Sequence, residues 1–200
     1  DKLNIPEGEV VINDDPASRE YGYQAVDPSQ RAIGDPNPDF ILGWNNSFRI
    51  KDVKLGFLLD WREGGDLWNG TAWALSFFGR SQLTADTREE APTPISGVLK
   101  SNGQPNTIPV VRDQSYWTSS LGGFGAVGEQ FVQDGGWLRL REVSLSYKLP
   151  LDLLGVNFIN SADISVLGRN LWYQSDYDGI DPETSLTGTG NGQGFDYFNM

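Results

Sequence analysis

The sequence predicts an all-β protein whose antiparallel strands form an open, curved sheet. Four segments alternate between apolar and polar residues, the connections between them are alternately short and long, and aromatic residues stand near the segment ends. This combination is typical of outer-membrane β-barrels, which carry short turns on one side of the membrane and long loops on the other. We therefore expect the strands of a transmembrane outer-membrane β-barrel, with long extracellular loops that contain a short helix.

The composition speaks against several classes of function. The 200 residues, enough for one domain, include 15 Lys and Arg against 27 Asp and Glu, for a net charge of −12. This balance disfavours a nucleic-acid partner, because phosphate contacts need a basic surface. The chain has no Cys and no His, which removes the usual zinc ligands and the common Ser and Cys nucleophiles. We expect no enzyme, no catalytic residue, no metal site and no cofactor.

The first two alternating segments form a predicted hairpin. In residues 39–49, one face carries Phe40, Leu42, Trp44, Asn46 and Phe48. In residues 52–62, the matching face carries Val53, Leu55, Phe57, Leu59 and Trp61. Only Ile50 and Lys51 lie between the segments, so the turn is tight. Residues 39–48 should pair with residues 52–62.

Two further segments alternate in the second half of the chain. In residues 137–148, one face carries Val143, Leu145 and Tyr147. In residues 161–173, one face carries Ala162, Ile164, Val166, Gly168 and Trp172. Leu138 and Leu140 have the opposite parity, so the alternation breaks near Arg141. A β-bulge, or a strand end that projects beyond the bilayer, would explain the break. Residues 137–148 should pair with residues 161–173 and also lie next to residues 52–62.

The formal charges of these segments stand on the face opposite to the apolar rows. They are Asp39, Asp52, Lys54, Asp60, Glu142, Lys148, Asp163 and Arg169, with Arg49 and Arg62 at strand ends. A half-buried sheet in a soluble protein shows the same split. The alternation by itself therefore leaves a secreted, soluble β-sandwich open as an alternative.

The connections and the aromatic residues favour the barrel. A long connection, residues 63–136, follows the second segment, whereas only a short stretch around Leu151–Asn160 follows the third. A soluble sandwich has no reason to sort its loops by side. Aromatic residues stand near the expected outer strand ends (Trp61, Trp137, Trp172) and inner ends (Phe48, Tyr147). They match the aromatic girdles of a barrel, although aromatic residues of a soluble core remain an alternative.

The long connection is expected to hold structure of its own. Asp66 to Gly79 predicts a short helix, with Asp66 as its N-cap and Gly79 as its C-terminal stop. Val10–Ile12 predicts another short strand.

Three motifs could carry chemistry. Gly123–Gly128 matches GxGxxG, but no strand precedes it and no helix follows, so loop glycines are expected. Asp176, Asp178, Asp181 and Glu183 crowd a loop and could hold Ca²⁺; a role in shaping the loop through backbone amides is the simpler interpretation. A glycosidase needs two acids that flank a cleft, and nothing in the sequence marks neighbouring acids such as Glu89 and Glu90 as such a pair.

Five segments, in order, resemble SusC/RagA-type TonB-dependent transporters of the bacterial outer membrane. They are Ile33–Phe40 (IGDPNPDF), Gly64–Asn69 (GGDLWN), Leu138–Tyr147 (LRLREVSLSY), Gly168–Leu171 (GRNL) and Tyr177–Glu183 (YDGIDPE). The match extends over most of the chain.

The resemblance implies a barrel of about 22 strands with a plugged lumen. It also implies import of glycans, oligosaccharides or peptides, driven through TonB and assisted by a SusD-like surface lipoprotein. A plug, a TonB-contacting segment and a final aromatic strand are missing from these 200 residues. We therefore expect residues 1–200 to be a C-terminal fragment of the barrel domain of a TonB-dependent receptor, in contact with membrane lipid.

The substrate-binding residues cannot be assigned from the sequence. Trp68, Trp73 and Trp117 could stack on sugars if they are exposed, or could pack the loop or meet the lipoprotein. The main alternative function is a secreted β-sandwich module that binds glycan.

Overall fold

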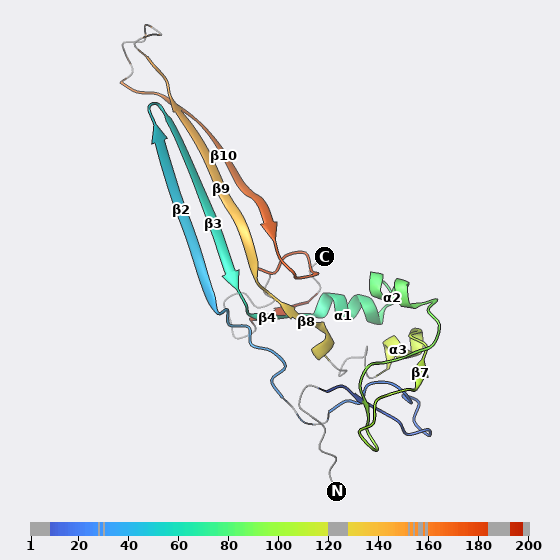
Figure 1. The fold of residues 1–200 in the computed structure, drawn as a ribbon. Coiled ribbons are helices and arrows are strands. Elements are labelled where there is room, and N and C mark those ends of the chain that lie inside the picture. Colours follow the sequence, from blue (N-terminus) through green and yellow to red (C-terminus); the bar gives the residue numbers. More distant parts are fainter. Residues whose placement is uncertain are drawn as a thin grey trace.

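The computed structural model describes residues 9–27, 29, 31–119, 128–151, 153, 155, 158, 160–183 and 193–197. The largest sheet has four strands, and Figure 1 shows it as long and curved, with a smaller region of short strands and helices at one end. We call this smaller region, formed by residues 9–27, 66–119, 128–134 and 193–197, the loop region. The sheet end beside it is the outer end, and the opposite end is the inner end. No helix in the described part of the chain is long and apolar enough to cross a membrane.

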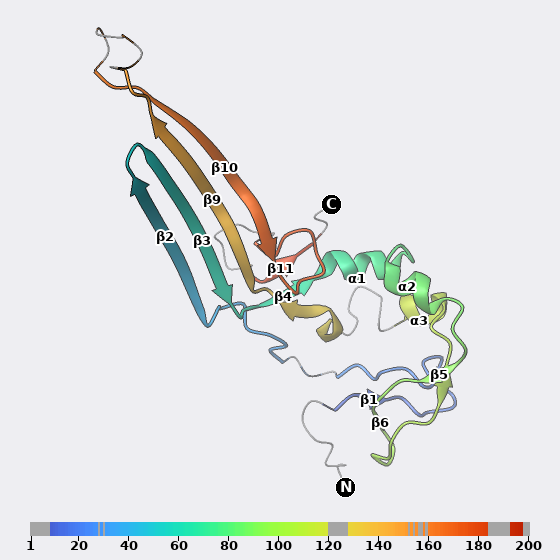
Figure 2. The same cartoon turned by 45° about the horizontal axis from the view of Figure 1, so that its top comes forward.

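The large sheet has the predicted strands and the predicted order. Its strands are β2 (Phe40–Ile50), β3 (Val53–Glu63), β9 (Trp137–Lys148) and β10 (Asp163–Gln174). The order is β10-β9-β3-β2, and each neighbouring pair is antiparallel. Both expected hairpin pairings and the contact between the second and third strands are confirmed. The sheet is curved and forms one layer (Figures 1 and 2).

The register separates an apolar face from a polar face. Trp44 pairs with Leu59 and Phe48 with Leu55, so the apolar rows of β2 and β3 coincide. On the other strands Val166 pairs with Leu145 in the same row. All of these side chains except the half-buried Leu59 are exposed, with 53% of Trp44 and 68% of Val166 accessible. An apolar face left open over four strands suits contact with lipid, whereas a sandwich core would bury it.

A bulge interrupts β9 where the alternation breaks. Leu58 of β3 pairs with Glu142 and the next residue, Leu59, pairs with Leu140, so Arg141 has no partner in this ladder. The pairing of β9 with β10 shifts at the same level, and Asn170 there has a φ of +49°. The extra residue returns Leu138 and Leu140 to the apolar face. The predicted bulge near Arg141 is confirmed.

The long connection is structured, as predicted. It contains β4 (Asp66–Asn69), α1 (Gly70–Phe77), α2 (Gln82–Thr87), β5 (Thr93–Pro94), β6 (Val98–Leu99), β7 (Pro109–Val110), α3 (Gln114–Thr118), the 3₁₀ turn η1 (Glu129–Phe131) and β8 (Val132–Asp134). The predicted strand at Val10–Ile12 is present as β1 (Val11–Ile12), which pairs in parallel with β6. Near the end of the described chain, β11 (Phe195–Asp196) joins β4, which also pairs with β8.

The helix begins later than predicted. Asp66 is not its N-cap, because residues 66–69 form β4 and the Asp66 carboxylate accepts a hydrogen bond from the backbone of Asp35. Asn69 caps the helix instead, accepting from the Ala72 amide at 2.8 Å. Gly79 ends the helix as predicted, with a φ of +65° that a glycine adopts without strain.

A small aromatic core holds the loop region together. It contains Tyr23, Val110, Tyr116 and Trp117, so the N-terminal segment packs against the long connection. Tyr23 and Tyr116 meet edge to face at 5.1 Å.

Two of the three tryptophans considered for sugar stacking are buried. Trp73 and Trp117 are each only 6% exposed, and Trp68 stacks on Tyr197 with the ring centres 5.8 Å apart. These rings therefore pack the loop region, which is one of the alternatives that the sequence left open for them. A large aromatic ring contributes most to stability when it is enclosed.

Candidate functional site

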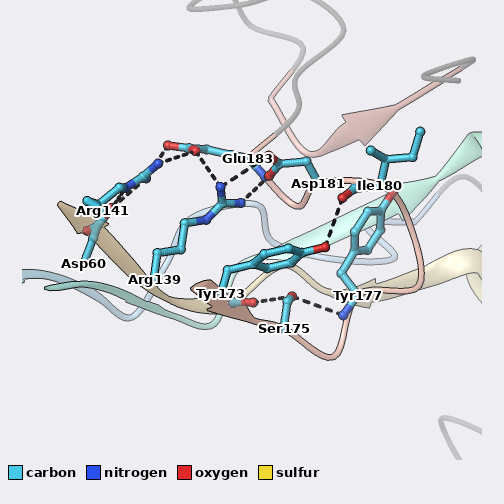
Figure 3. Close-up of polar contacts among 10 residues, drawn as sticks. Asp60, Arg139, Arg141, Tyr173, Ser175, Tyr177, Ile180, Asp181 and Glu183 are labelled. Atoms are coloured by element: carbon cyan, nitrogen blue, oxygen red, sulfur yellow. Dashed lines mark hydrogen bonds and ion pairs between the residues drawn. The ribbon is translucent and has the colours of Figure 1, made fainter. Parts of the chain in front are cut away.

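The most densely bonded group of charged residues lies at the outer end of the polar face. Arg139 and Arg141 come from β9, Asp60 from β3, and Asp181 and Glu183 from the loop after β10. Figure 3 shows the two arginine side chains directed toward the three carboxylates. We call these five residues the arginine clamp.

Arg141 stands between two carboxylates. Its Nε and Nη2 donate to Asp60 Oδ2 at 2.9 and 2.7 Å. Its Nη1 and Nη2 donate to Glu183 at 2.9 and 2.6 Å. The fork of an arginine matches a carboxylate in this bidentate way, which makes such pairs stronger than neutral hydrogen bonds. The strand and the loop are thereby tied through one side chain.

Arg139 is the buried member of the clamp. It bonds Asp181 through both terminal nitrogens and lies 3.2 Å from Glu183. Its side chain is only 8% exposed, while the two carboxylates are 41% and 43% exposed. A buried charge needs such partners, because leaving it unpaired costs far more than a surface charge would.

Trp137 belongs to this site and not to the outer girdle. The guanidinium groups of Arg62 and Arg139 lie 5.1 and 5.2 Å from its ring centre, and Trp137 is 8% exposed. Its expected place in a lipid-facing row was wrong, because the bulge at Arg141 turns Trp137 to the polar face. Trp61 and Trp172 do remain exposed near the outer strand ends.

Hydrogen bonds shape the loop that the clamp holds. Ser175 Oγ donates to the Gly136 carbonyl at 2.7 Å and accepts from the Tyr177 amide at 3.2 Å. The Tyr173 hydroxyl donates to the Ile180 carbonyl at 3.3 Å (Figure 3). We call residues 175–183 the clamped loop. It lies folded against the outer end of β9 and β10.

The four acids considered as Ca²⁺ ligands do not converge. Asp181 and Glu183 bind the arginines, Asp178 accepts from Gln133 at 3.2 Å, and Asp176 is exposed. The described residues contain no group of three or more acidic side chains arranged to hold a metal ion. The Asp181 carboxylate also accepts from the Glu183 amide at 2.8 Å, which is the loop-shaping role that the sequence predicted.

A second tie joins the clamped loop to the loop region. Tyr177 donates its hydroxyl to Asp196, which is 1% exposed and also accepts from Thr71 at 3.2 Å. Burial, the hydrogen bond to Asp196 and the nearby charges of Asp196 and Asp178 raise the pKa of Tyr177. Tyr177 therefore stays a neutral donor, and it fixes the loop from the side away from the arginines.

The GxGxxG segment at Gly123–Gly128 lies outside the described residues except for Gly128. The Gly128 carbonyl accepts from the Trp68 indole at 3.1 Å.

The role of the two arginines of the clamp was not predicted from the sequence, although Arg139 and Arg141 stand where the alternation of β9 breaks. Opposite charges at such a break are a signal that could have suggested an ion-pair site.

Acid should release the clamped loop. Partial burial opposes ionisation of Asp181, but hydrogen bonds from Arg139 and the Glu183 amide, with the charges of Arg139 and Arg141, lower its pKa below the ordinary 3.8. A lowered pKa adds stability at pH values above the ordinary pKa, and this stability is lost as the pH falls through the folded-state pKa. We expect the loop to stay docked at neutral pH and to detach below about pH 3.8.

An environment-sensitive dye on Ile180→Cys would report this release, because Ile180 is 62% exposed. In Asp181→Asn the loop should already be loosened at neutral pH. An unchanged pH profile in Asp181→Asn would show that this carboxylate does not hold the loop.

Comparison with known proteins was made on the sequence and on the fold. No family model matches the chain. It is 28% identical to TonB-dependent receptor P3 of Formosa agariphila over 196 residues, which cover 94% of the chain and 18% of that receptor. It is 28% identical to TonB-dependent receptor P26 of the same bacterium over 163 residues, which cover 78% of the chain and 14% of that receptor.

The fold is similar to part of a solved importer. The RagAB peptide importer in its open-open state matches with a TM-score of 0.56 at 17% identity, over 86% of this chain and 17% of that one. Its closed-closed state matches with a TM-score of 0.52 at 17% identity, over 80% and 17%. The chain spans less than a fifth of the length of these relatives. The predicted resemblance to SusC/RagA-type TonB-dependent proteins and the predicted outer-membrane location are confirmed.

Proposed function

We propose that this chain, which resembles TonB-dependent receptors over most of its length, forms a section of the barrel wall of an outer-membrane nutrient importer. Residues 1–200 would supply four neighbouring strands from the C-terminal part of the barrel, together with one long extracellular loop. The whole protein would take up glycans, oligosaccharides or peptides with energy delivered through TonB. A SusD-like lipoprotein would assist it on the cell surface. Its relatives are named as receptors and an importer, and the chain itself would catalyse no reaction.

One observation carries the proposal: one face of the sheet is apolar and largely exposed, and the opposite face carries the charged side chains. Ile164 and Val166 on β10 are 58% and 68% exposed, as is usual for side chains that meet lipid. Arg49 and Lys54 on the other face belong with a polar interior. Among the described strands, β2 and β10 have a neighbour on one side only, so each can accept another barrel strand.

A soluble glycan-binding sandwich is the weaker candidate. It would need a second layer to bury the apolar face, because a sandwich core forms between two packed sheets about 10 Å apart. Most apolar side chains on this face of β2, β3 and β10 are exposed instead, and Phe57 and Leu59 are half-buried. The tryptophans that were candidates for sugar stacking are packed inside the loop region, which removes the feature that favoured glycan recognition.

The loop region is the part that would meet the surface lipoprotein. It joins the outer end of the sheet, where the long connections gather (Figure 2). In a barrel the long loops lie outside the cell, so this region would be accessible to a lipid-anchored partner. TonB acts from the periplasmic side and would reach a part of the protein beyond these strands.

Uptake by the full-length protein tests the proposal. Cells that carry the full-length gene should deplete labelled peptides or labelled oligosaccharides from the medium, and a deletion strain should not. A protonophore should stop uptake in the first strain, because TonB-driven transport needs the proton gradient. Recovery of the protein in the soluble fraction would favour the sandwich. Depletion that persists with the protonophore would contradict TonB-driven import.

A further inference from the structure

The loop region carries an open groove that plays no part in the arginine clamp. It lies between the C-terminal end of α1, the helix α2 and the N-terminal end of α3, and has a volume of about 500 Å³. Figure 2 shows these three helices gathered away from the sheet. Binding sites for small ligands commonly fall in the range of about 300–1,000 Å³. The groove therefore has room for two or three residues of an extended chain.

Aromatic rings form the apolar part of the groove. Phe77 and Phe78 meet edge to face with their centres 5.1 Å apart. Phe78 is 61% exposed at the rim, whereas Trp117 is 6% exposed and closes the floor. An exposed phenylalanine beside a hollow loses water contact when an apolar side chain covers it, which favours binding.

Two arginines provide the polar part. Arg88 and Arg112 both line the groove. Within the described part of the chain, the Arg88 side chain donates one long hydrogen bond, 3.3 Å, to the Gly79 carbonyl. Arg112 pairs with Glu90 at 2.9 Å, and their side chains are 34% and 46% exposed. An exposed pair of this kind contributes little to stability, so a carboxylate from a ligand can replace Glu90.

Several polar side chains of the groove are already bonded to neighbouring residues. Ser76 bonds Ser81, and Thr84 donates to the Ser81 carbonyl. The Asp113 carboxylate caps α3 through the Ser115 and Tyr116 amides. Sugar hydroxyls need acceptors as well as donors, and beside the Gln114 amide a neutral glycan would meet mainly the cationic donors of Arg88 and Arg112. A ligand that brings its own carboxylates suits the groove better.

We propose that this groove binds a peptide segment in which a carboxylate lies next to an apolar side chain. The apolar side chain covers Phe78, and the carboxylate pairs with Arg88 and Arg112 by charge-assisted hydrogen bonds. The occupant is a free peptide from outside the cell, held at the surface before import. Its role as cargo rests on the proposed transport function, but its binding does not.

Binding to the detergent-solubilised full-length protein tests the proposal. The probe is a fluorescein-labelled hexapeptide of alternating Phe and Glu, followed by fluorescence anisotropy, and the comparison peptide has Gln in place of Glu. We expect the Glu peptide to bind, and the Gln peptide to bind about tenfold more weakly. The double variant Arg88→Gln, Arg112→Gln should lose affinity for the Glu peptide by about tenfold or more. Phe78→Ser should also weaken binding of both peptides.

Two control variants separate the groove from general charge effects. Arg80→Gln removes the same charge from an exposed residue of the same region that does not line the groove, and it should bind like the wild type. Glu90→Gln frees Arg112 from its competitor and should bind the Glu peptide about two- to fivefold more tightly.

Equal affinity in the wild type and the double arginine variant would overturn the proposal. Displacement of the peptide by an equal concentration of neutral maltohexaose would do so too. Heat-modifiable mobility on gels confirms that each variant is folded. Because binding is measured without a membrane, a failure of transport leaves this result unaffected.

Discussion

Phe57→Arg is expected to remove most of the folded full-length protein from the outer membrane. Phe57 lies near the middle of β3 on the apolar face, where its ring meets Trp44 edge to face at 5.3 Å. An Arg at mid-bilayer costs about 2–4 kcal/mol, and the cost falls to about 0–1 kcal/mol near the interface. Trp61→Arg, close to the outer end of the same strand, should therefore reduce assembly less. Heat-modifiable mobility of the protein in isolated outer membranes measures the folded fraction.

The neighbouring residue supplies a matched control. Leu58 lies on the polar face and pairs with Glu142 on β9, so Leu58→Arg places the same charge beside a carboxylate. This variant should assemble nearly as well as the wild type. Phe57→Leu keeps the site apolar and separates the effect of charge from the loss of ring contacts. If Phe57→Arg assembled fully while Leu58→Arg failed, the two faces would have to be exchanged, and the barrel interpretation would lose its physical basis.

Arg139→Gln is expected to release the clamped loop while the sheet stays folded. The substitution removes the buried cation that binds Asp181 and Glu183 and leaves both carboxylates without it. Hydrogen bonds to charged groups contribute about 1.5–3 kcal/mol, and the partial exposure of the carboxylates places the expected loss in the lower half of that range. The loss is local, because the ladder between β9 and β10 does not depend on this side chain. Hydrogen exchange of residues 175–183 in the full-length protein measures it.

Arg169→Gln is the control for this prediction. Arg169 pairs with Glu142 at 3.4 Å on the same sheet, but its side chain is 71% exposed. Exposed pairs contribute about 0–1 kcal/mol, so exchange in the clamped loop should not change. Equal acceleration of exchange in both variants would mean that general charge on the sheet, and not the clamp, holds the loop.

The four long strands could be predicted from the sequence because their signal is local. Side chains of a strand alternate with a period of two, and Leu55, Phe57 and Leu59 show it without reference to any other segment. The lengths of the connections then predicted which strands are neighbours, because a connection of only two residues, Ile50 and Lys51, joins two strands as a hairpin. The alternation of short and long connections and the aromatic residues at the strand ends indicated a membrane barrel, and the resemblance of five segments to known transporters added the family; neither composition nor net charge reveals either.

The helix start was predicted at the wrong residue for a physical reason. Both Asp66 and Asn69 are good N-caps, so the local signal does not choose between them. The choice depends on β4, which exists because β8 and β11 pair with residues 66–69. Those partners come from residues 132–134 and 195–196, far along the chain.

The candidate site depended still more on contacts between distant residues. The sequence determined that residues 39–62 and 137–173 form two-faced strands, because one face must be apolar and the other polar wherever a sheet separates two environments. Only the tertiary structure decided that Arg139 and Arg141 bind Asp181 and Glu183, that Trp137 joins them, and that Tyr23 packs on Tyr116. Such contacts form only when the bulge, the strand register and the loop path all agree, and no local pattern of residues encodes that agreement.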